Sequence, residues 1–166
     1  MFNKKGMVMW RFAAGLLSAA LATGLLSGCA HGVVTSKTSD VVITLKRGAC
    51  LGPCPAYDVT LYGDGTVIFI GHGQTVYVGE KHYRIDPGEV ARLYSYIDTR
   101  GFWGLQDKYA VSWTDQVFID VCVADAARKK CVVDYSGLNA GMPQSVREIE
   151  AEIDRVAESA PLVGKH

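Results

Sequence analysis

AYDVTLYGDGTVIFI, residues 56–70, predicts two antiparallel strands joined by a tight turn. Residues 56–62 alternate between polar and apolar side chains, and residues 66–70 are rich in β-branched and aromatic side chains. Both patterns are typical of strands. Gly63-Asp64-Gly65 lies between them and supplies the positive φ angles that a tight hairpin turn requires. An antiparallel sheet is therefore the expected basis of the fold.

Further strands are predicted on both sides of this hairpin, at residues 40–46, 75–85, 116–123 and 131–135. The segment 75–85 follows a turn at Gly71-His72-Gly73 and is expected to bend at Gly79. The last two strands form a second hairpin with Arg128-Lys129-Lys130 at its tip. This basic tip could contact an acidic surface, but a solvated turn is the commoner reason for such a run.

Two segments have helical periodicity. The first helix is expected to begin at Asp86, which can cap it, with Pro87 in its first turn, and to end at Gly101. Its apolar face comprises Val90, Leu93, Tyr94 and Ile97. The second helix is expected over residues 143–157, with an apolar face of Val146, Ile149, Ile153 and Val156 and with Arg147, Glu148, Glu150, Glu152 and Asp154 elsewhere. The predicted fold class is α+β: a curved antiparallel β-sheet of about six strands with two helices packed on one face.

Composition narrows the class of protein. The chain has 166 residues, of which 49% are apolar, and its 17 basic residues balance 17 acidic ones. The length suits one domain, and this apolar content predicts a folded core rather than a disordered chain. The absence of net charge argues against a nucleic-acid partner, because proteins that bind nucleic acid carry a basic excess or stripe.

The N-terminal segment has the pattern of a secretory signal. Lys4, Lys5 and Arg11 precede an uncharged, mainly apolar run at residues 12–26. A membrane-spanning helix needs about 20 apolar residues, more than this run supplies. The run ends in Leu26-Ser27-Gly28-Cys29, which resembles the lipobox of bacterial lipoprotein precursors. An ordinary signal peptide is the alternative, although this tetrapeptide fits the Ala-x-Ala-like cleavage pattern less well.

The lipobox resemblance implies how the chain is processed. Residues 1–28 are then a lipoprotein signal peptide, Cys29 is the acylated N-terminus of the mature protein, and residues 29–39 are a lipidated tether. A single α+β domain follows at residues 40–166. By the same resemblance, Ala30 in place of Asp implies sorting to the outer membrane, facing the periplasm. Membrane lipid is thus the expected partner of acylated Cys29, since several acyl chains together anchor a protein stably.

Four cysteines remain once Cys29 is assigned to lipid, and an even number in an exported chain predicts disulfides. They are Cys50, Cys54, Cys122 and Cys131. Four cysteines allow three pairings. A turn near Ala126 and Ala127 would make Cys122 and Cys131 face each other, which favours that pair and leaves Cys50 to pair with Cys54.

Cys50-x-x-x-Cys54-Pro55 is also similar to the copper site of Sco-type chaperones. That resemblance implies thiolate ligands for Cu(I), which suits soft sulfur donors. The chaperones place the motif before a helix, whereas a strand is expected here after Pro55. A periplasmic thiol-redox or copper-handling protein that uses Cys50 and Cys54 is therefore the alternative to a structural disulfide.

A second pattern is carried by Arg47-Gly48-Ala49-Cys50, Gly52-Pro53-Cys54-Pro55-x-Tyr57 and Gly63-Asp64-Gly65-Thr66-Val67. These stretches resemble the opening of the domain of unknown function 6438 family, which occurs in small bacterial exported proteins. Later similarities are Phe102-Trp103, Thr114-Asp115, Asp134-Tyr135 and the helix around residues 149–153. The resemblance covers nearly the whole domain and implies no particular activity, because none is established for the family.

Enzyme and metal motifs are sparse. The sequence lacks a nucleophile elbow, a phosphate-binding loop, a dinucleotide motif and a zinc-protease motif, so we expect no enzymatic activity and no cofactor. His72 and His82 could hold a metal together with Glu80 or Asp86, but histidines at strand ends are more often plain surface residues. We therefore expect no metal site.

Two other groups are weaker candidates for a site. Asp115, Asp120 and Asp134 could converge near the second hairpin, although the odd spacing of Asp115 and Asp120 places them on opposite faces. Trp103, Tyr109 and Trp113 could form an aromatic binding platform, although such residues more often pack in the core. The expected function is a membrane-anchored, non-enzymatic binding module of the bacterial cell envelope, with an envelope protein or peptidoglycan as its partner.

Overall fold

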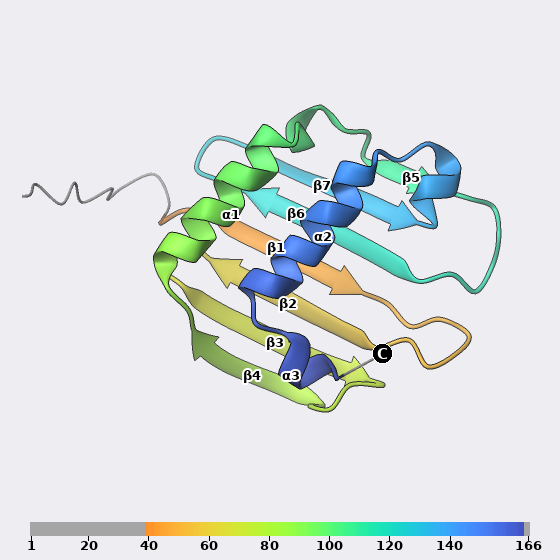
Figure 1. Ribbon diagram of the computed structural model, residues 1–166, viewed down its shortest axis with the longest axis horizontal. Coiled ribbons are helices and arrows are strands. Elements are labelled where there is room, and N and C mark those ends of the chain that lie inside the picture. Colours follow the sequence, from red (N-terminus) through yellow and green to blue (C-terminus); the bar gives the residue numbers. More distant parts are fainter. Residues whose placement is uncertain (1–38, 165–166) are drawn as a thin grey trace, which may run out of the picture. The chain divides into compact units, whose positions relative to one another are not determined.

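The computed structural model describes residues 39–164. Its centre is a seven-stranded sheet with the strand order β4-β3-β2-β1-β6-β7-β5 (Figure 1). The strands are β1 Val42–Arg47, β2 Ala56–Tyr62, β3 Thr66–Gly73, β4 Gly79–Arg84, β5 Lys108–Ala110, β6 Phe118–Ala124 and β7 Lys129–Tyr135. The helices are α1 Pro87–Thr99, α2 Gln144–Val156 and α3 Ala160–Val163, with short 3-10 helices at Phe102–Gly104 and Gly137–Ala140.

The α+β class is confirmed, and the sheet departs from the expectation in two respects. It has seven strands rather than six, because Lys108–Ala110 forms a strand too short for an alternating pattern to reveal it. This strand, β5, pairs in parallel with β7, whereas the other paired strands are antiparallel. The expectation of a purely antiparallel sheet is therefore wrong at this edge.

Alternating side chains fix how the strands pair. Ile43 and Leu45 of β1 are fully buried, and their neighbours in sequence point to the opposite face of the sheet. The register places Val59 of β2 and Val121 of β6 directly beside Leu45. Because the period is two residues, a slip by one residue would expose this entire apolar set, so the pattern selects the observed register.

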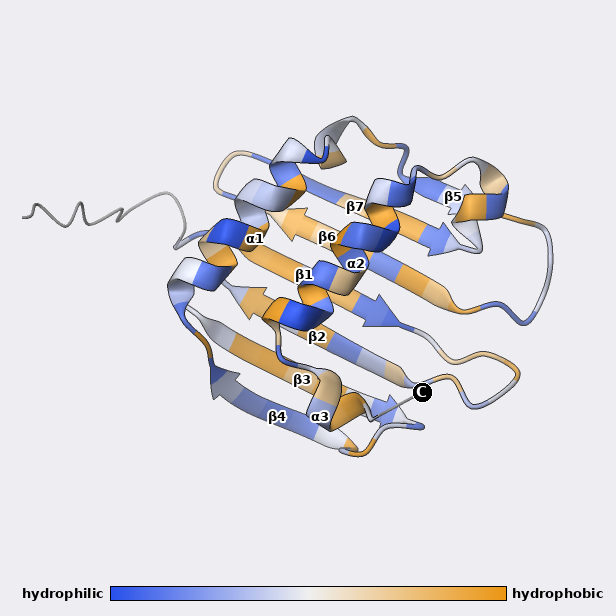
Figure 2. Cartoon of the chain, viewed as in Figure 1, coloured by the Kyte–Doolittle hydropathy of each residue, from blue (hydrophilic) through white to orange (hydrophobic). Residues whose placement is uncertain are grey.

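The two long helices, α1 and α2, lie across the same face of the sheet (Figure 1). α1 begins as predicted, because Asp86 Oδ1 accepts a hydrogen bond of 2.8 Å from the backbone N–H of Gly88. Gly101, with a φ of 74°, follows its last turn. Both helices carry polar residues, in blue, on the side away from the sheet (Figure 2). The third helix, α3, was not expected, because four residues are too few to show helical periodicity.

The predicted strand at 75–85 begins only at Gly79. The segment before it bonds to the end of the chain instead: the N–H groups of Val76 and Tyr77 donate to the carbonyl oxygens of Val163 and Leu162, at 3.4 and 3.0 Å. Gly79 has a φ of 107°, which allows the chain to change direction there. This connection therefore holds α3 in place rather than lengthening β4.

Residues 1–38 include the predicted signal peptide, Cys29 and nearly all of the tether, and they lie outside the described residues. Within residues 39–164, none of the helices is long and apolar enough to cross a membrane.

Candidate functional site

The four cysteines of the domain lie in two disulfide-bonded pairs. Cys122 of β6 is directly opposite Cys131 of β7, with their Cα atoms 4.1 Å apart. Cys50 and Cys54 close the loop between β1 and β2, with their Cα atoms 5.6 Å apart. This is the arrangement that the hairpin geometry favours, and the oxidation state of the four sulfurs in the cell stays a prediction.

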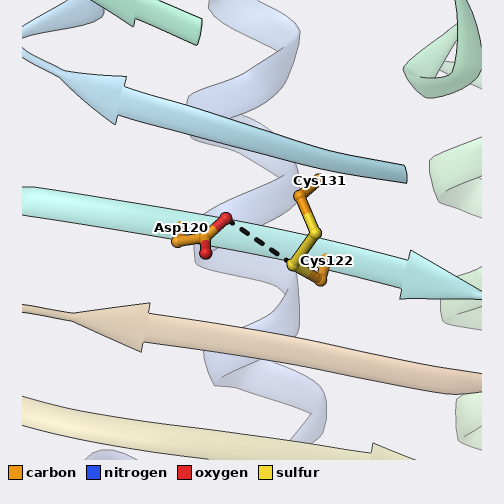
Figure 3. Close-up of side chains that lie close together, drawn as sticks. All are labelled: Asp120, Cys122 and Cys131. Atoms are coloured by element: carbon orange, nitrogen blue, oxygen red, sulfur yellow. Dashed lines mark hydrogen bonds between the residues drawn. A yellow bond between two sulfur atoms is a disulfide. The ribbon is translucent and has the colours of Figure 1, made fainter. Parts of the chain in front are cut away.

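Asp120, Cys122 and Cys131 form the one group among residues 39–164 whose potential metal ligands lie close together (Figure 3). Their ligand atoms lie within 4.8 Å of one another, and Asp120 Oδ1 is 3.6 Å from Cys122 Sγ. Burial raises the pKa of Asp120, and the positive charges of Lys46 and Lys129 oppose that rise. Metal ligation requires thiolates, so the group offers no thiolate ligand while its disulfide is intact.

The loop that carries Cys50 and Cys54 is open to solvent, with Leu51 at its tip 84% exposed. In the described part of the chain, no histidine or acidic side chain joins this pair as a third metal ligand. The strand β2 starts at Ala56, directly after the motif. The context therefore differs from the motif-before-helix arrangement of the copper chaperones, as the sequence predicts.

The structure does not bring His72 and His82 together. His72 Nε2 lies 3.4 Å from Asp58 Oδ1, whereas His82 Nε2 contacts a carboxylate oxygen of Glu80 on its own strand. In the β3–β4 register His82 is opposite Ile68, well before His72 along β3. Each histidine therefore has its own carboxylate neighbour, and the two form no common metal-binding group within residues 39–164.

The three aspartates noted in the sequence also separate. Asp115 lies in the connection between β5 and β6 with a φ of 66°. Asp134 is buried on the helix side of β7 and pairs with Ile119 in the β6–β7 register. Asp120, the neighbour of Ile119, therefore points to the face away from the helices. Asp134 instead meets charged groups that the sequence did not single out.

The aromatic residues form no common platform either. Trp103 packs edge-to-face against Phe102, with 5.9 Å between the ring centroids, and the guanidinium of Arg128 lies 3.7 Å from the Trp103 centroid. Tyr109 is buried, whereas Trp113 is 55% exposed. Packing thus accounts for Trp103 and Tyr109, and the basic hairpin tip is partly held by a cation–π contact.

A cluster of polar and charged side chains lies between α2 and one end of the sheet. This charged cluster comprises Arg47, Tyr57, Asp134, Arg147, Glu150 and Asp154. The first three come from β1, β2 and β7. The other three share one stripe of α2, because residues three and four apart lie on the same side of a helix.

One half of the charged cluster is built around Asp154. Arg47 donates from Nε and Nη2 to Asp154 Oδ2, at 3.2 and 2.9 Å, and the Tyr57 hydroxyl donates to Oδ1 at 2.9 Å. Burial is the largest influence on the pKa of Arg47 and lowers it, but Asp154, Tyr57 and Glu150 together outweigh burial, so the pKa is raised. Burial also raises the pKa of Tyr57, so its hydroxyl remains a donor.

The other half joins Asp134, Arg147 and Glu150. Asp134 and Glu150 are each only 1% exposed. Arg147 Nε lies 3.0 Å from Asp134 Oδ2, and Arg147 Nη1 donates to Glu150 Oε2 at 3.4 Å. Burial, followed by the charge of Asp134, raises the pKa of Glu150 to about 7. The carboxyl group of Glu150 therefore titrates near neutral pH.

A pocket of about 250 Å³ opens beside the charged cluster. Its lining residues are Arg47, Gln116, Val117, Ile119, Ser136 and Arg147. The two arginines thus belong to both the cluster and the pocket, whereas the three carboxyl groups do not line it. Ser136 has a φ of 54°, a conformation that is uncommon outside glycine and concentrated at functional sites.

The sequence analysis missed most of this charged cluster. It placed Glu150 on the polar side of the second helix, yet Glu150 is buried. The spacing held a signal, because Val146, Glu150 and Ile153 follow one another at helical intervals and so share a face. Charged residues are seldom fully buried, so Glu150 was predicted to be exposed although its position on the helix is on the buried face.

A family model described as a domain of unknown function (DUF6438) matches residues 41–157. The match starts just before β1 and ends just after α2, so it contains the whole sheet and the charged cluster. No curated protein matches the chain.

Proposed function

Because the chain belongs to the DUF6438 family, whose description assigns no function, we propose one from its own residues: a lipid-anchored binding protein of the bacterial cell envelope. Lipid on Cys29 holds the domain at the outer membrane, facing the periplasm, after removal of residues 1–28. The domain binds an envelope protein or peptidoglycan and catalyses no reaction.

The observation that carries this proposal is the pairing of cysteines. The chain has five cysteines, and four of them lie in two disulfide-bonded pairs within the domain. That pairing leaves Cys29, at the end of the lipobox, for the lipid. Disulfides also suit a compartment outside the cytosol, where thiols are oxidised.

Intact-mass spectrometry of the full-length gene product, recovered from bacterial membranes, tests the anchor. The expected product begins at Cys29 and carries the added mass of acyl chains. The Cys29→Ser variant is the control and should lack that mass and leave the membrane fraction. A wild-type product that begins at another residue, or that carries no acyl mass, contradicts the proposal.

The alternative function is thiol-redox or copper chemistry at Cys50 and Cys54. The exposure of Leu51 between them favours it, because an exposed loop admits a reductant or a metal donor. Thiol counting under mild reduction distinguishes the two functions. Rapid reduction of Cys50–Cys54 with uptake of Cu(I), while Cys122–Cys131 stays oxidised, supports the alternative. Two disulfides that both resist mild reduction support a structural role.

A further inference from the structure

The pocket beside the charged cluster has a wall rich in hydrogen-bond donors. Arg47 comes from β1 and Arg147 from α2, while Gln116 and Ser136 come from connections next to β6 and β7. A guanidinium carries five N–H donors, and an amide and a hydroxyl add more. The two remaining lining residues are apolar. Such a wall suits an anionic group attached to a small apolar one.

The two arginines are held in place by carboxylates from behind the pocket. Arg47 engages Asp154 through Nε and Nη2, and Arg147 engages Asp134 and Glu150 through Nε and Nη1. Within residues 39–164, Nη2 of Arg147 makes no hydrogen bond, and Nη1 of Arg47 makes none but lies 3.9 Å from Glu150 Oε2. Because both guanidinium groups are already fixed, a ligand that uses these donors loses little affinity to side-chain ordering.

Charge balance disfavours more than one negative charge in the pocket. When Glu150 is protonated, the two arginines balance Asp134 and Asp154, and the positive groups line the pocket while the carboxylates do not. When Glu150 is ionised, the cluster carries a net negative charge that repels an anion. A dianion such as phosphate would add two negative charges to a neutral cluster, whereas a carboxylate adds one.

We propose that the pocket binds a carboxylate attached to a short apolar group, as in small organic acids and at the C-terminus of a peptide. The inference rests on the proposed function, because it treats the domain as a binding module. The two oxygens of a carboxylate can each accept a charge-assisted hydrogen bond, one from Arg47 and one from Arg147. Val117 and Ile119 contact the apolar group, and a pocket of about 250 Å³ admits only a small ligand.

Binding of the carboxylate is coupled to protonation of Glu150. The groups that face Glu150 are Arg47 of β1, Asp134 of β7 and Arg147 of its own helix. A bound anion disfavours ionisation of Glu150, as Asp134 does, so the ligand and the proton favour each other's binding. With a Glu150 pKa of about 7, the protonated fraction, and with it the affinity, falls by up to about tenfold from pH 6 to pH 8.

Isothermal titration calorimetry of the full-length protein tests the ligand class. N-acetylalanine imitates a peptide C-terminus, propionate is a free small acid, and the amide of N-acetylalanine lacks the charge. Saturable binding of either acid at pH 6, weaker at pH 8, supports the proposal, and the tighter of the two identifies the source. Binding of neither acid, equal binding of the amide, or tighter binding of inorganic phosphate overturns it.

Variants test the assigned residues. Arg147→Gln should weaken acid binding by at least about tenfold, the usual cost of losing a charged hydrogen-bond pair. Arg100→Gln is the matched control, because Arg100 pairs with Glu148 at 2.6 Å and does not line the pocket. Glu150→Gln should keep binding and lose its pH dependence. Unchanged binding in Arg147→Gln overturns the proposal.

A second lining residue keeps the test decisive if Arg147→Gln does not fold. Gln116→Leu removes a donor from a connection rather than from the helix, and it should weaken acid binding several-fold. Unchanged binding in this variant likewise overturns the proposal. Acyl mass on Cys29 without acid binding refutes only this inference, whereas acid binding without acyl mass refutes only the proposed anchor.

Discussion

Replacing Glu150 with Gln should remove much of the pH dependence of folding between pH 5 and pH 8. The pKa of Glu150 is raised from 4.5 to about 7, first by burial and then by the charge of Asp134. Between these values the folded protein holds a proton that the unfolded chain has released. The free energy of unfolding therefore falls as the pH rises through this range.

The size of the effect follows from the difference between the two pKa values. The raised pKa lowers the free energy of unfolding by about 3 kcal/mol once Glu150 is fully ionised in the folded protein. About 2 kcal/mol of this decrease falls between pH 5 and pH 8. Gln resembles the protonated acid in shape and is neutral throughout. The stability of Glu150→Gln relative to the wild type should therefore rise by about 2 kcal/mol over this range.

Urea unfolding followed by circular dichroism, at several pH values and with the disulfides intact, measures this difference. Glu152→Gln is the control, because Glu152 lies on the same helix and Arg155 lowers its pKa instead of raising it. That variant should gain no stability relative to the wild type as the pH rises. Parallel stability profiles for the wild type and Glu150→Gln from pH 5 to pH 8 would refute the reasoning.

Three further changes are expected to lower stability. Gly65→Ala should cost more than about 1 kcal/mol, since Gly65 has a φ of 86° and an added Cβ would lie 2.4 Å from a carbonyl oxygen. Gly73→Ala, where the Cβ meets nothing within 4 Å, should change little in the same urea titration. Asp86→Ala should cost about 1 kcal/mol by removing the cap of α1, and an unchanged urea midpoint would show that the cap is dispensable. Replacing Cys122 and Cys131 together with Ser should lower the free energy of unfolding by roughly 2–3 kcal/mol, because it removes a constraint on the unfolded chain. An unchanged melting temperature under oxidising conditions would contradict this prediction.

The strands that depend on local pattern were predictable from the sequence. Gly63-Asp64-Gly65 indicated the β2–β3 hairpin, and the structure has Gly65 in the left-handed region as that turn requires. The strand β5 was not predictable in this way, because it has three residues and its place depends on pairing with β7. Pairing between segments far apart in the chain leaves no periodic signal in the shorter of the two.

The charged cluster was hidden for a related reason. Burial of Asp134 and Glu150 requires compensating cations, and these are supplied by Arg47 on a distant strand and Arg147 on α2. The family resemblance includes Arg47, Tyr57 and Asp134 among its motif residues but assigns them no role. These side chains come together under one helix only in the folded chain. The sequence therefore indicates some of the residues but not that they form one cluster.

The central position of β1 has a mechanical consequence. β1 is the first strand of the sheet, yet it is hydrogen-bonded to β2 along one edge and to β6 along the other. A pulling force on the chain before Val42 therefore acts along the axis of a strand that is hydrogen-bonded on both sides. Its hydrogen bonds run across the direction of pull and must shear together instead of unzipping in turn. A domain that is pulled through a central strand in this way resists unfolding better than one that is pulled through an outermost strand.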